Sequence, residues 1–164
     1  MIVEAKAVKL GDNIDTDVIL PGKYLVLTDP AELGNHALEG LAGFHAKLTD
    51  GVAIAAGENF GQGSSREHAP IALKAAGVRC VVAHSIARIF YRNSIAIGLP
   101  VVQCLGILAA VNDGDRLLID LARGQIRNLA NGTTVNAEPV PNNLLPVLED
   151  GGIIEHLKRK RTRR

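Results

Sequence analysis

The segment "GENFGQGSSREHAP", Gly57 to Pro70, gathers residue types that could bind an anion. It holds two hydroxyls, Ser64 and Ser65, and the guanidinium of Arg66. All three precede a predicted helix, where backbone N–H groups and the helix dipole favour negative charge. A guanidinium can also hold a carboxylate through two parallel hydrogen bonds. The segment therefore suggests a binding site for a small carboxylate.

A helix cap is the alternative to a ligand site. Ser64 and Glu67 have the spacing of a capping box, in which the serine accepts a hydrogen bond from a backbone N–H and the glutamate reaches back. Pro70 would then lie in the second turn, where its missing N–H disfavours a regular helix. The residue chemistry leaves both interpretations open.

The same segment does not match the common nucleotide or hydrolase motifs. Its glycine spacing differs from the dinucleotide fingerprint, and no lysine precedes a serine or threonine as in a P-loop. It also lacks G-x-S-x-G, and spacing selects no triad partner among the five histidines. A serine here could act as a base only if positive groups stabilised its alkoxide, which Arg66 and nearby N–H groups could do.

Composition and pattern indicate the fold that positions this segment. The chain has 164 residues, 47% of them hydrophobic and 3% aromatic, which suits one layered α/β domain. Predicted strands cover 4–10, 52–57, 78–85 and 99–104, and predicted helices cover 29–41, 71–77 and 86–98. This alternation is typical of a parallel sheet. Turn residues separate further strands over 115–121, 125–129 and 133–137, which predicts an added antiparallel C-terminal meander before helical residues at 142–160.

Charge, cysteine content and hydropathy limit the function classes. Six of the 18 basic residues lie between Lys158 and Arg164, so the sequence predicts a domain over 1–157 and a basic, solvated tail over 158–164. No aromatic residues are interleaved with this tail, which disfavours nucleic-acid binding. No apolar run is long enough to cross a membrane, so we expect a cytoplasmic protein.

Cys80 and Cys104 lie in apolar strands, and two cysteines cannot hold an iron–sulfur cluster alone.

Three motifs together resemble a known family. They are "GDNIDTDVILPGKYL", "GENFGQGSSREHAPIALKAAGV" and "SIARIFYRNSIAIGLPVV". In this order they resemble the swivelling domain of the aconitase superfamily, in its stand-alone form as the small subunit of 3-isopropylmalate dehydratase and its relatives. The motifs cover residues 1 to 105, and the remainder agrees in layout and length. The resemblance implies one swivelling β/β/α domain over 1–157 that closes over a large subunit carrying a [4Fe–4S] cluster, with no metal bound by this chain.

The resemblance also implies roles for individual residues. Ser64 corresponds to the catalytic base, and Ser65 and Arg66 correspond to residues that contact a substrate carboxylate. Asp17 corresponds to an aspartate near the active site, although a turn-capping role stays open for it. The implied reaction is the isomerisation of 2-isopropylmalate and 3-isopropylmalate in leucine biosynthesis, by a hydro-lyase that is active only with its large subunit.

The loop after "PGKYL" corresponds to the family's substrate-reading loop. Small subunits that handle tricarboxylates are expected to have an arginine there, whereas this chain has Val26 and Leu27. Leaving a carboxylate buried and unpaired would cost several kcal/mol. We therefore expect isopropylmalate rather than dimethylmalate or citramalate, with homoaconitate as the poorest substrate. This inference about the substrate fails if Val26 and Leu27 are ordinary core residues. For the chain as a whole, the alternative function is a non-enzymatic anion-binding module.

Overall fold

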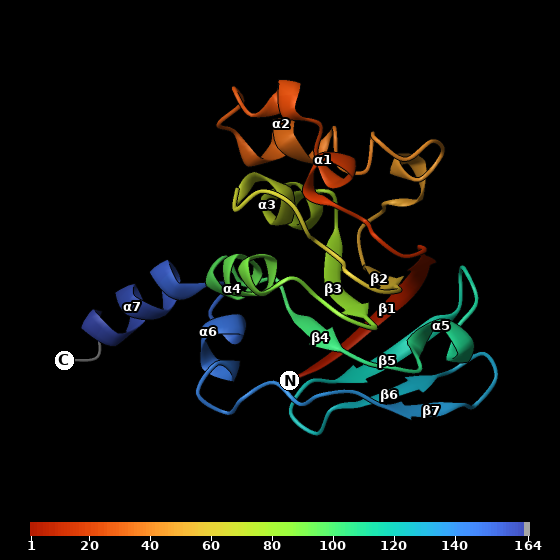
Figure 1. Ribbon diagram of the computed structural model, residues 1–164. Helices are drawn as coiled ribbons and strands as arrows, with labels where there is room; N and C mark the ends of the chain where they lie inside the picture. Colours follow the sequence, from red (N-terminus) through yellow and green to blue (C-terminus); the bar gives the residue numbers. More distant parts are fainter. Residues whose placement is uncertain (163–164) are drawn as a thin grey trace.

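The computed structural model describes residues 1–162, which form a seven-stranded sheet with helices on its two faces (Figure 1). The strand order is β4-β3-β2-β1-β5-β6-β7. The parallel strands are β1 (Ile2–Lys9), β2 (Val52–Ala56), β3 (Val78–Ala83) and β4 (Val101–Gln103). The antiparallel strands are β5 (Arg116–Asp120), β6 (Gln125–Asn128) and β7 (Thr134–Asn136). The predicted α/β class, with its parallel core and antiparallel C-terminal meander, is confirmed.

The described residues form a helix in each predicted place, although not always with the predicted length, and four further short helices over 16–19, 22–24, 45–47 and 107–110 that were not predicted. They are α1 (Thr16–Ile19), η1 (Gly22–Tyr24), α2 (Pro30–Gly34), η2 (His45–Lys47), α3 (His68–Ala75), α4 (Arg88–Ala96), α5 (Ile107–Ala110), α6 (Leu145–Glu149) and α7 (Ile153–Thr162). Asp29 caps α2 and Pro30 is its first residue. The predicted helix over 29–41 was too long, because α2 ends at Gly34 and the chain continues in turns, with a positive φ of 57° at Leu38.

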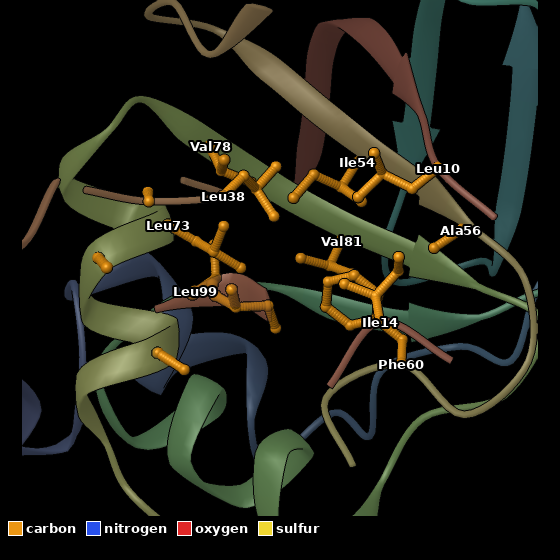
Figure 2. Packing of buried hydrophobic residues seen from close by; sticks show 14 of the residues in the cluster. Leu10, Ile14, Leu38, Ile54, Ala56, Phe60, Leu73, Val78, Val81 and Leu99 are labelled. Atoms are coloured by element: carbon orange, nitrogen blue, oxygen red, sulfur yellow. The ribbon is translucent and has the colours of Figure 1, made fainter. Parts of the chain in front are cut away.

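Two apolar clusters lie on the opposite faces of the sheet, and β2 contributes to both. Val52, Ile54 and Ala56 belong to the cluster beneath α3, whereas Ala53 and Ala55 belong to the cluster on the other face. This alternation follows from the two-residue period of a strand. Figure 2 shows part of the first cluster between the sheet and α3. Burial on both faces explains why "VAIAA" is apolar throughout.

The loops that follow β1, β2 and β3 lie side by side at one edge of the sheet. These strands are parallel, so their carboxyl ends meet there. The N–H of Gly61, after β2, donates to the carbonyl of Ile14, after β1, at 2.7 Å. The N–H of Ala87, after β3, donates to the carbonyl of Phe60 at 2.9 Å. The segment from Gly57 to Pro70 is thus held between the two neighbouring loops.

Gly61 packs tightly against the side chain of Phe90 in α4. Its φ is 75°, and a Cβ atom there would lie 2.2 Å from Cγ of Phe90. We expect Gly61→Ala to lower the free energy of unfolding by about 3 kcal/mol, through backbone strain and overpacking together. Gly43→Ala is the matched control, since Gly43 has a φ of 80° but open space around it, and we expect a loss of about 1 kcal/mol. Urea denaturation measures both values. If the two variants lost the same free energy of unfolding, the contact with Phe90 would contribute nothing to the loss in Gly61→Ala.

The C-terminal region differs from the predicted tail. Helix α7 lies next to α6, extends away from the sheet (Figure 1) and continues without interruption through Lys158 as far as Thr162. The predicted boundary after residue 157 therefore falls inside a helix, and residues 163–164 of that tail lie outside the described residues. None of the helices in residues 1–162 has the length and apolar character needed to cross a bilayer.

Candidate active site

A narrow crevice between α1 and the start of α3, too tight in this structure to hold a water molecule, contains three of the predicted site residues. Its lining consists of Thr16, Asp17, Leu20, Leu25, Ser64, Arg66 and Ala69. Asp17 comes from α1, whereas Ser64 and Arg66 come from the loop after β2. The register that pairs Lys9 with Ala55 brings the ends of β1 and β2 together, and with them these two segments. The structure thus joins residues that are almost 50 positions apart in the chain.

Ser64 has an unusual environment for a hydroxyl. Its Oγ is buried and has no hydrogen-bond partner in the part of the chain that the structure describes. Its backbone N–H, in contrast, donates to Oγ1 of Thr16 at 3.0 Å. Buried polar atoms without a partner are rare in native proteins and call for an explanation. The Ser64 hydroxyl lies in one crevice with a guanidinium, and a ligand that reached it would not have to displace a protein hydrogen-bond partner within residues 1–162.

The alternative role of Ser64 as a helix cap does not hold. Helix α3 begins at His68, its N-cap is Glu67, and no side chain hydrogen-bonds to that end of the helix. The capping box between Ser64 and Glu67 is therefore not formed. Pro70 consequently lies in the first turn, where a missing N–H costs little. The uncapped N–H groups of α3 begin directly after Arg66, which favours an anion at this place.

Arg66 and Asp17 are both exposed, and neither takes part in an ion pair within residues 1–162. Both lie against Gly22, the first residue of η1. A Cβ atom on Gly22 would be 3.7 Å from Nη1 of Arg66 and 3.9 Å from Oδ1 of Asp17. A larger side chain would occupy the space in front of both groups, so glycine keeps it open. Sequence spacing gives no signal for Gly22, since its role depends on a contact across 44 residues.

Ser65 is not among the residues that line the crevice. Its side chain is exposed, and its carbonyl oxygen accepts a hydrogen bond from Nδ2 of Asn93 at 2.9 Å. Ser65 is thus placed beside Ser64 and Arg66 but toward solvent. Its predicted contact with a substrate carboxylate stays a prediction.

Val26 and Leu27 also lie outside the crevice, whose apolar side is formed by Leu25 instead. Val26 is 84% exposed, so it is not an ordinary core residue. Leu27 is half-buried and packs against the apolar cluster beneath α3. The alternative of a core position therefore applies to Leu27 and not to Val26. Val26 remains available to meet a substrate or a second chain.

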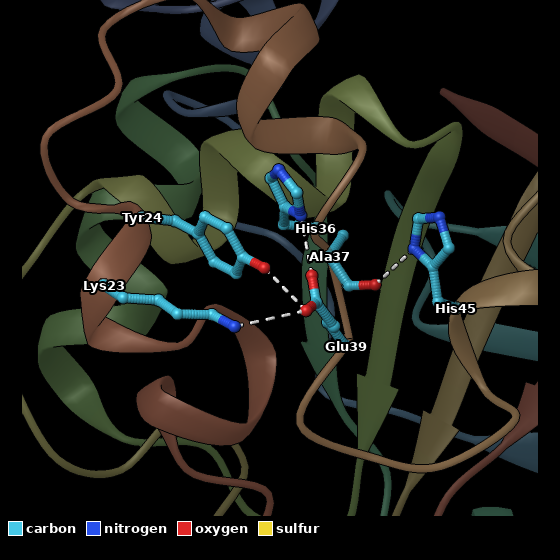
Figure 3. Close-up of polar contacts among 6 residues, drawn as sticks. All are labelled: Lys23, Tyr24, His36, Ala37, Glu39 and His45. Atoms are coloured by element: carbon cyan, nitrogen blue, oxygen red, sulfur yellow. Dashed lines mark hydrogen bonds and ion pairs between the residues drawn. The ribbon is translucent and has the colours of Figure 1, made fainter.

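A polar network holds η1, the short helix that directly precedes Leu25, Val26 and Leu27 (Figure 3). The hydroxyl of Tyr24 donates to Oε1 of Glu39 at 2.6 Å, and the Tyr24 ring stacks on His36 with a centroid separation of 3.6 Å. Nδ1 of His36 lies 2.6 Å from Oε2 of Glu39, and Nζ of Lys23 lies 3.6 Å from Oε1. The hydrogen bonds from Tyr24 and then His36 lower the pKa of Glu39. This network holds η1 in place beside Arg66. No motif in the sequence predicted the network.

The two cysteines do not fit an iron–sulfur cluster. Both are buried, and burial raises the pKa of the Cys80 thiol to about 12, so it stays protonated. Burial likewise raises the pKa of Cys104. A cluster ligand must be a thiolate. Within residues 1–162 there is also no group of three or more His, Cys, Asp or Glu side chains that could hold a metal ion.

Comparison with known proteins decides the family. The family described as the aconitase C-terminal domain matches residues 42–104, which include Ser64 and Arg66. The 3-isopropylmalate dehydratase small subunit 1 of Methanopyrus kandleri is 50% identical over 160 residues, which are 97% of this chain and 94% of that protein. The chain belongs to the family of 3-isopropylmalate dehydratase small subunits. The resemblance inferred from the three motifs is therefore confirmed.

Other members of the small-subunit family agree in sequence and in structure. The isopropylmalate/citramalate isomerase small subunit of Methanocaldococcus jannaschii is 47% identical over 97% of this chain and 95% of its own length. A crystal structure of a 3-isopropylmalate dehydratase from the same organism has a TM-score of 0.91 at 42% identity, and the match covers 99% of this chain and 96% of that one. The shared fold therefore extends over the whole chain, beyond the region of the three motifs.

Proposed function

We propose that this chain is the small subunit of a heteromeric hydro-lyase that interconverts 2-isopropylmalate and 3-isopropylmalate, a step of leucine biosynthesis. The observation that carries the proposal is the buried, unpartnered Oγ of Ser64 in one crevice with Arg66 and Asp17. Membership of the small-subunit family supports the same reaction. The partner is then a large subunit, and a cytoplasmic location stays a prediction.

In the proposed reaction, Ser64 transfers a proton and Arg66 binds the negatively charged carboxylate of the substrate. The Ser64 alkoxide takes the proton from the carbon next to a substrate carboxylate, while the hydroxyl on the neighbouring carbon leaves as hydroxide and an alkene forms. Arg66 holds the carboxylate and stabilises the negative charge that develops on it. Ser64 then returns the proton to the carbon that had lost the hydroxyl, which regenerates the alkoxide, and hydroxide adds to the other carbon.

The rest of the catalytic machinery is assigned to the large subunit. Neither Cys80 nor Cys104 suits a cluster, so we assign the [4Fe–4S] cluster of the proposed complex to the partner. When bound there, such a cluster supplies a Lewis acid for the departing hydroxyl. This chain contributes the base, the carboxylate grip and, through Asp17, a second polar group at the same crevice.

The substrate assignment depends on the apolar segment after η1. Val26 is almost fully exposed, Leu25 lines the crevice, and no cationic side chain lies in the run from Tyr24 to Thr28. A branched alkyl group suits such a surface better than a third carboxylate does. Citramalate is a second candidate substrate, because a relative at 47% identity is named as an isomerase of both acids.

Reconstitution tests the proposed function. We expect the isolated chain to be inactive and to gain dehydratase activity when it is mixed with a large iron–sulfur subunit of this family. Dehydration to the alkene would be assayed with isopropylmalate, citramalate, dimethylmalate and homoaconitate, and we expect kcat/KM to be highest for isopropylmalate. Carboxylate binding by the isolated chain, with no activity in any mixture, would instead support a non-enzymatic anion-binding module.

A further inference from the structure

Side chains from two other elements hold the dipeptide Ser64–Ser65 at its two ends. Oγ1 of Thr16, in α1, accepts the hydrogen bond from the Ser64 N–H at 3.0 Å. Nδ2 of Asn93, in α4, donates to the Ser65 carbonyl at 2.9 Å. No sequence pattern predicts a role for Thr16 or Asn93.

Thr16 contacts the loop at more than one point. Its own N–H donates to the carbonyl of Gln62 at 2.8 Å, and its side chain is buried with only 5% of the residue exposed. A Cβ atom on Gly63, whose φ is 110°, would lie 2.8 Å from Oγ1 of Thr16. Glycine at this position thus allows the loop to approach Thr16 closely. Three consecutive residues of the loop, Gln62 to Ser64, are held against α1.

The position of the Ser64 hydroxyl depends on these backbone contacts. Its Oγ has no hydrogen-bond partner within residues 1–162, so no polar contact of the side chain fixes its direction. The approach of a base to a C–H bond is sensitive to distance, and a displacement of about 1 Å can reduce a rate about 100-fold. The groups that hold the Ser64 backbone therefore determine the position of its Oγ atom, the proposed base.

We propose that Thr16 and Asn93 are positioning residues that hold Ser64 in place for proton transfer. This inference rests on the proposed function, because it takes Ser64 as the base. Thr16 precedes Asp17 directly in α1, so one short helix both anchors the base and presents a polar group to the same crevice. Neither Thr16 nor Asn93 needs to touch the substrate for this role.

The test uses isosteric and truncated variants in the reconstituted enzyme. Thr16→Val keeps the shape of the side chain but leaves the Ser64 N–H without its acceptor, and Asn93→Ala removes the donor to Ser65. We expect each to lower kcat about 10- to 100-fold with little change in KM. Thr16→Ser keeps the acceptor and should restore most of kcat. Thr134→Val and Asn136→Ala, both at exposed positions of β7, are the matched controls and should retain wild-type kcat.

Several outcomes would overturn the inference, and they differ from a failure of the proposed function. Wild-type kcat in both Thr16→Val and Asn93→Ala, with Ser64→Ala inactive, would overturn the positioning role alone. An equal loss in Thr16→Val and Thr16→Ser would do the same, because the acceptor would then be irrelevant. If Thr16→Val fails to fold by circular dichroism, kcat and KM of Asn93→Ala decide the matter. An inactive wild-type mixture would refute the proposed function and the inference with it.

Discussion

Replacing Ser64 with alanine is expected to reduce kcat of the reconstituted enzyme by between about 100-fold and 10,000-fold, because the variant has no group that can take the substrate proton. KM should change much less, since Arg66 still holds the carboxylate. The free energy of unfolding should not fall, because the substitution removes a buried Oγ atom that has no hydrogen-bond partner in the described chain. Steady-state kinetics and urea denaturation measure the two effects.

The combination of lost activity and retained stability separates a catalytic role from a structural one. Size-exclusion chromatography of the mixed subunits is the control for assembly, and we expect the variant to bind the large subunit as the wild type does. Activity within a few-fold of the wild type would exclude Ser64 as the base. A variant that is both inactive and clearly less stable would indicate a structural role instead.

Replacing Arg66 with glutamine is expected to raise KM and to lower kcat/KM by roughly 30- to 1,000-fold. Glutamine cannot form the charged, two-pronged contact with a carboxylate, and losing such a contact costs about 2–4 kcal/mol in a desolvated complex. Arg66 is exposed in the isolated chain, so the free energy of unfolding should change by no more than about 0.5 kcal/mol.

Arg127→Gln provides the matched control for this variant. Arg127 is an exposed residue of β6, on the antiparallel part of the sheet, and it forms no ion pair within residues 1–162. We expect its replacement to leave both kcat and KM unchanged. If Arg127→Gln weakened the enzyme as much as Arg66→Gln, a general effect of net charge would explain the result, and the proposed carboxylate grip would be wrong.

Local pattern was sufficient for most of the fold. The apolar run "VAIAA" and the alternation in "EAKAVKL" correspond to β2 and β1, because burial on one or both faces of a sheet leaves a direct trace in the sequence. The helix predicted over 29–41 ends at Gly34, and the turns that follow it include a non-glycine residue with positive φ, Leu38. Such a turn depends on tertiary packing, since Leu38 is fully buried, and propensity carries no signal for it.

The candidate site was predictable in its residue types but not in its construction. Motifs identified Ser64, Arg66 and Asp17, and the structure places them in one crevice. The choice between ligand site and helix cap at Ser64 depended on where α3 begins, which sequence patterns define only to within a few residues. Thr16 and Asn93 were missed because each meets the loop across more than 25 positions.

The crevice is assembled from two parts with separate supports. The loop of Ser64 is tied to the loops after β1 and β3, whereas η1 and the residues that follow it are tied to Glu39. Within the described chain, no hydrogen bond joins residues 21–28 to residues 57–67. Under the proposed function, we therefore expect substitutions in residues 21–28 to alter which side group of an acid is accepted with little displacement of Ser64. Because the two segments are supported separately, the same proton-transfer loop would serve a series of malate-type acids. The changes in substrate specificity would then be confined to a few exposed residues.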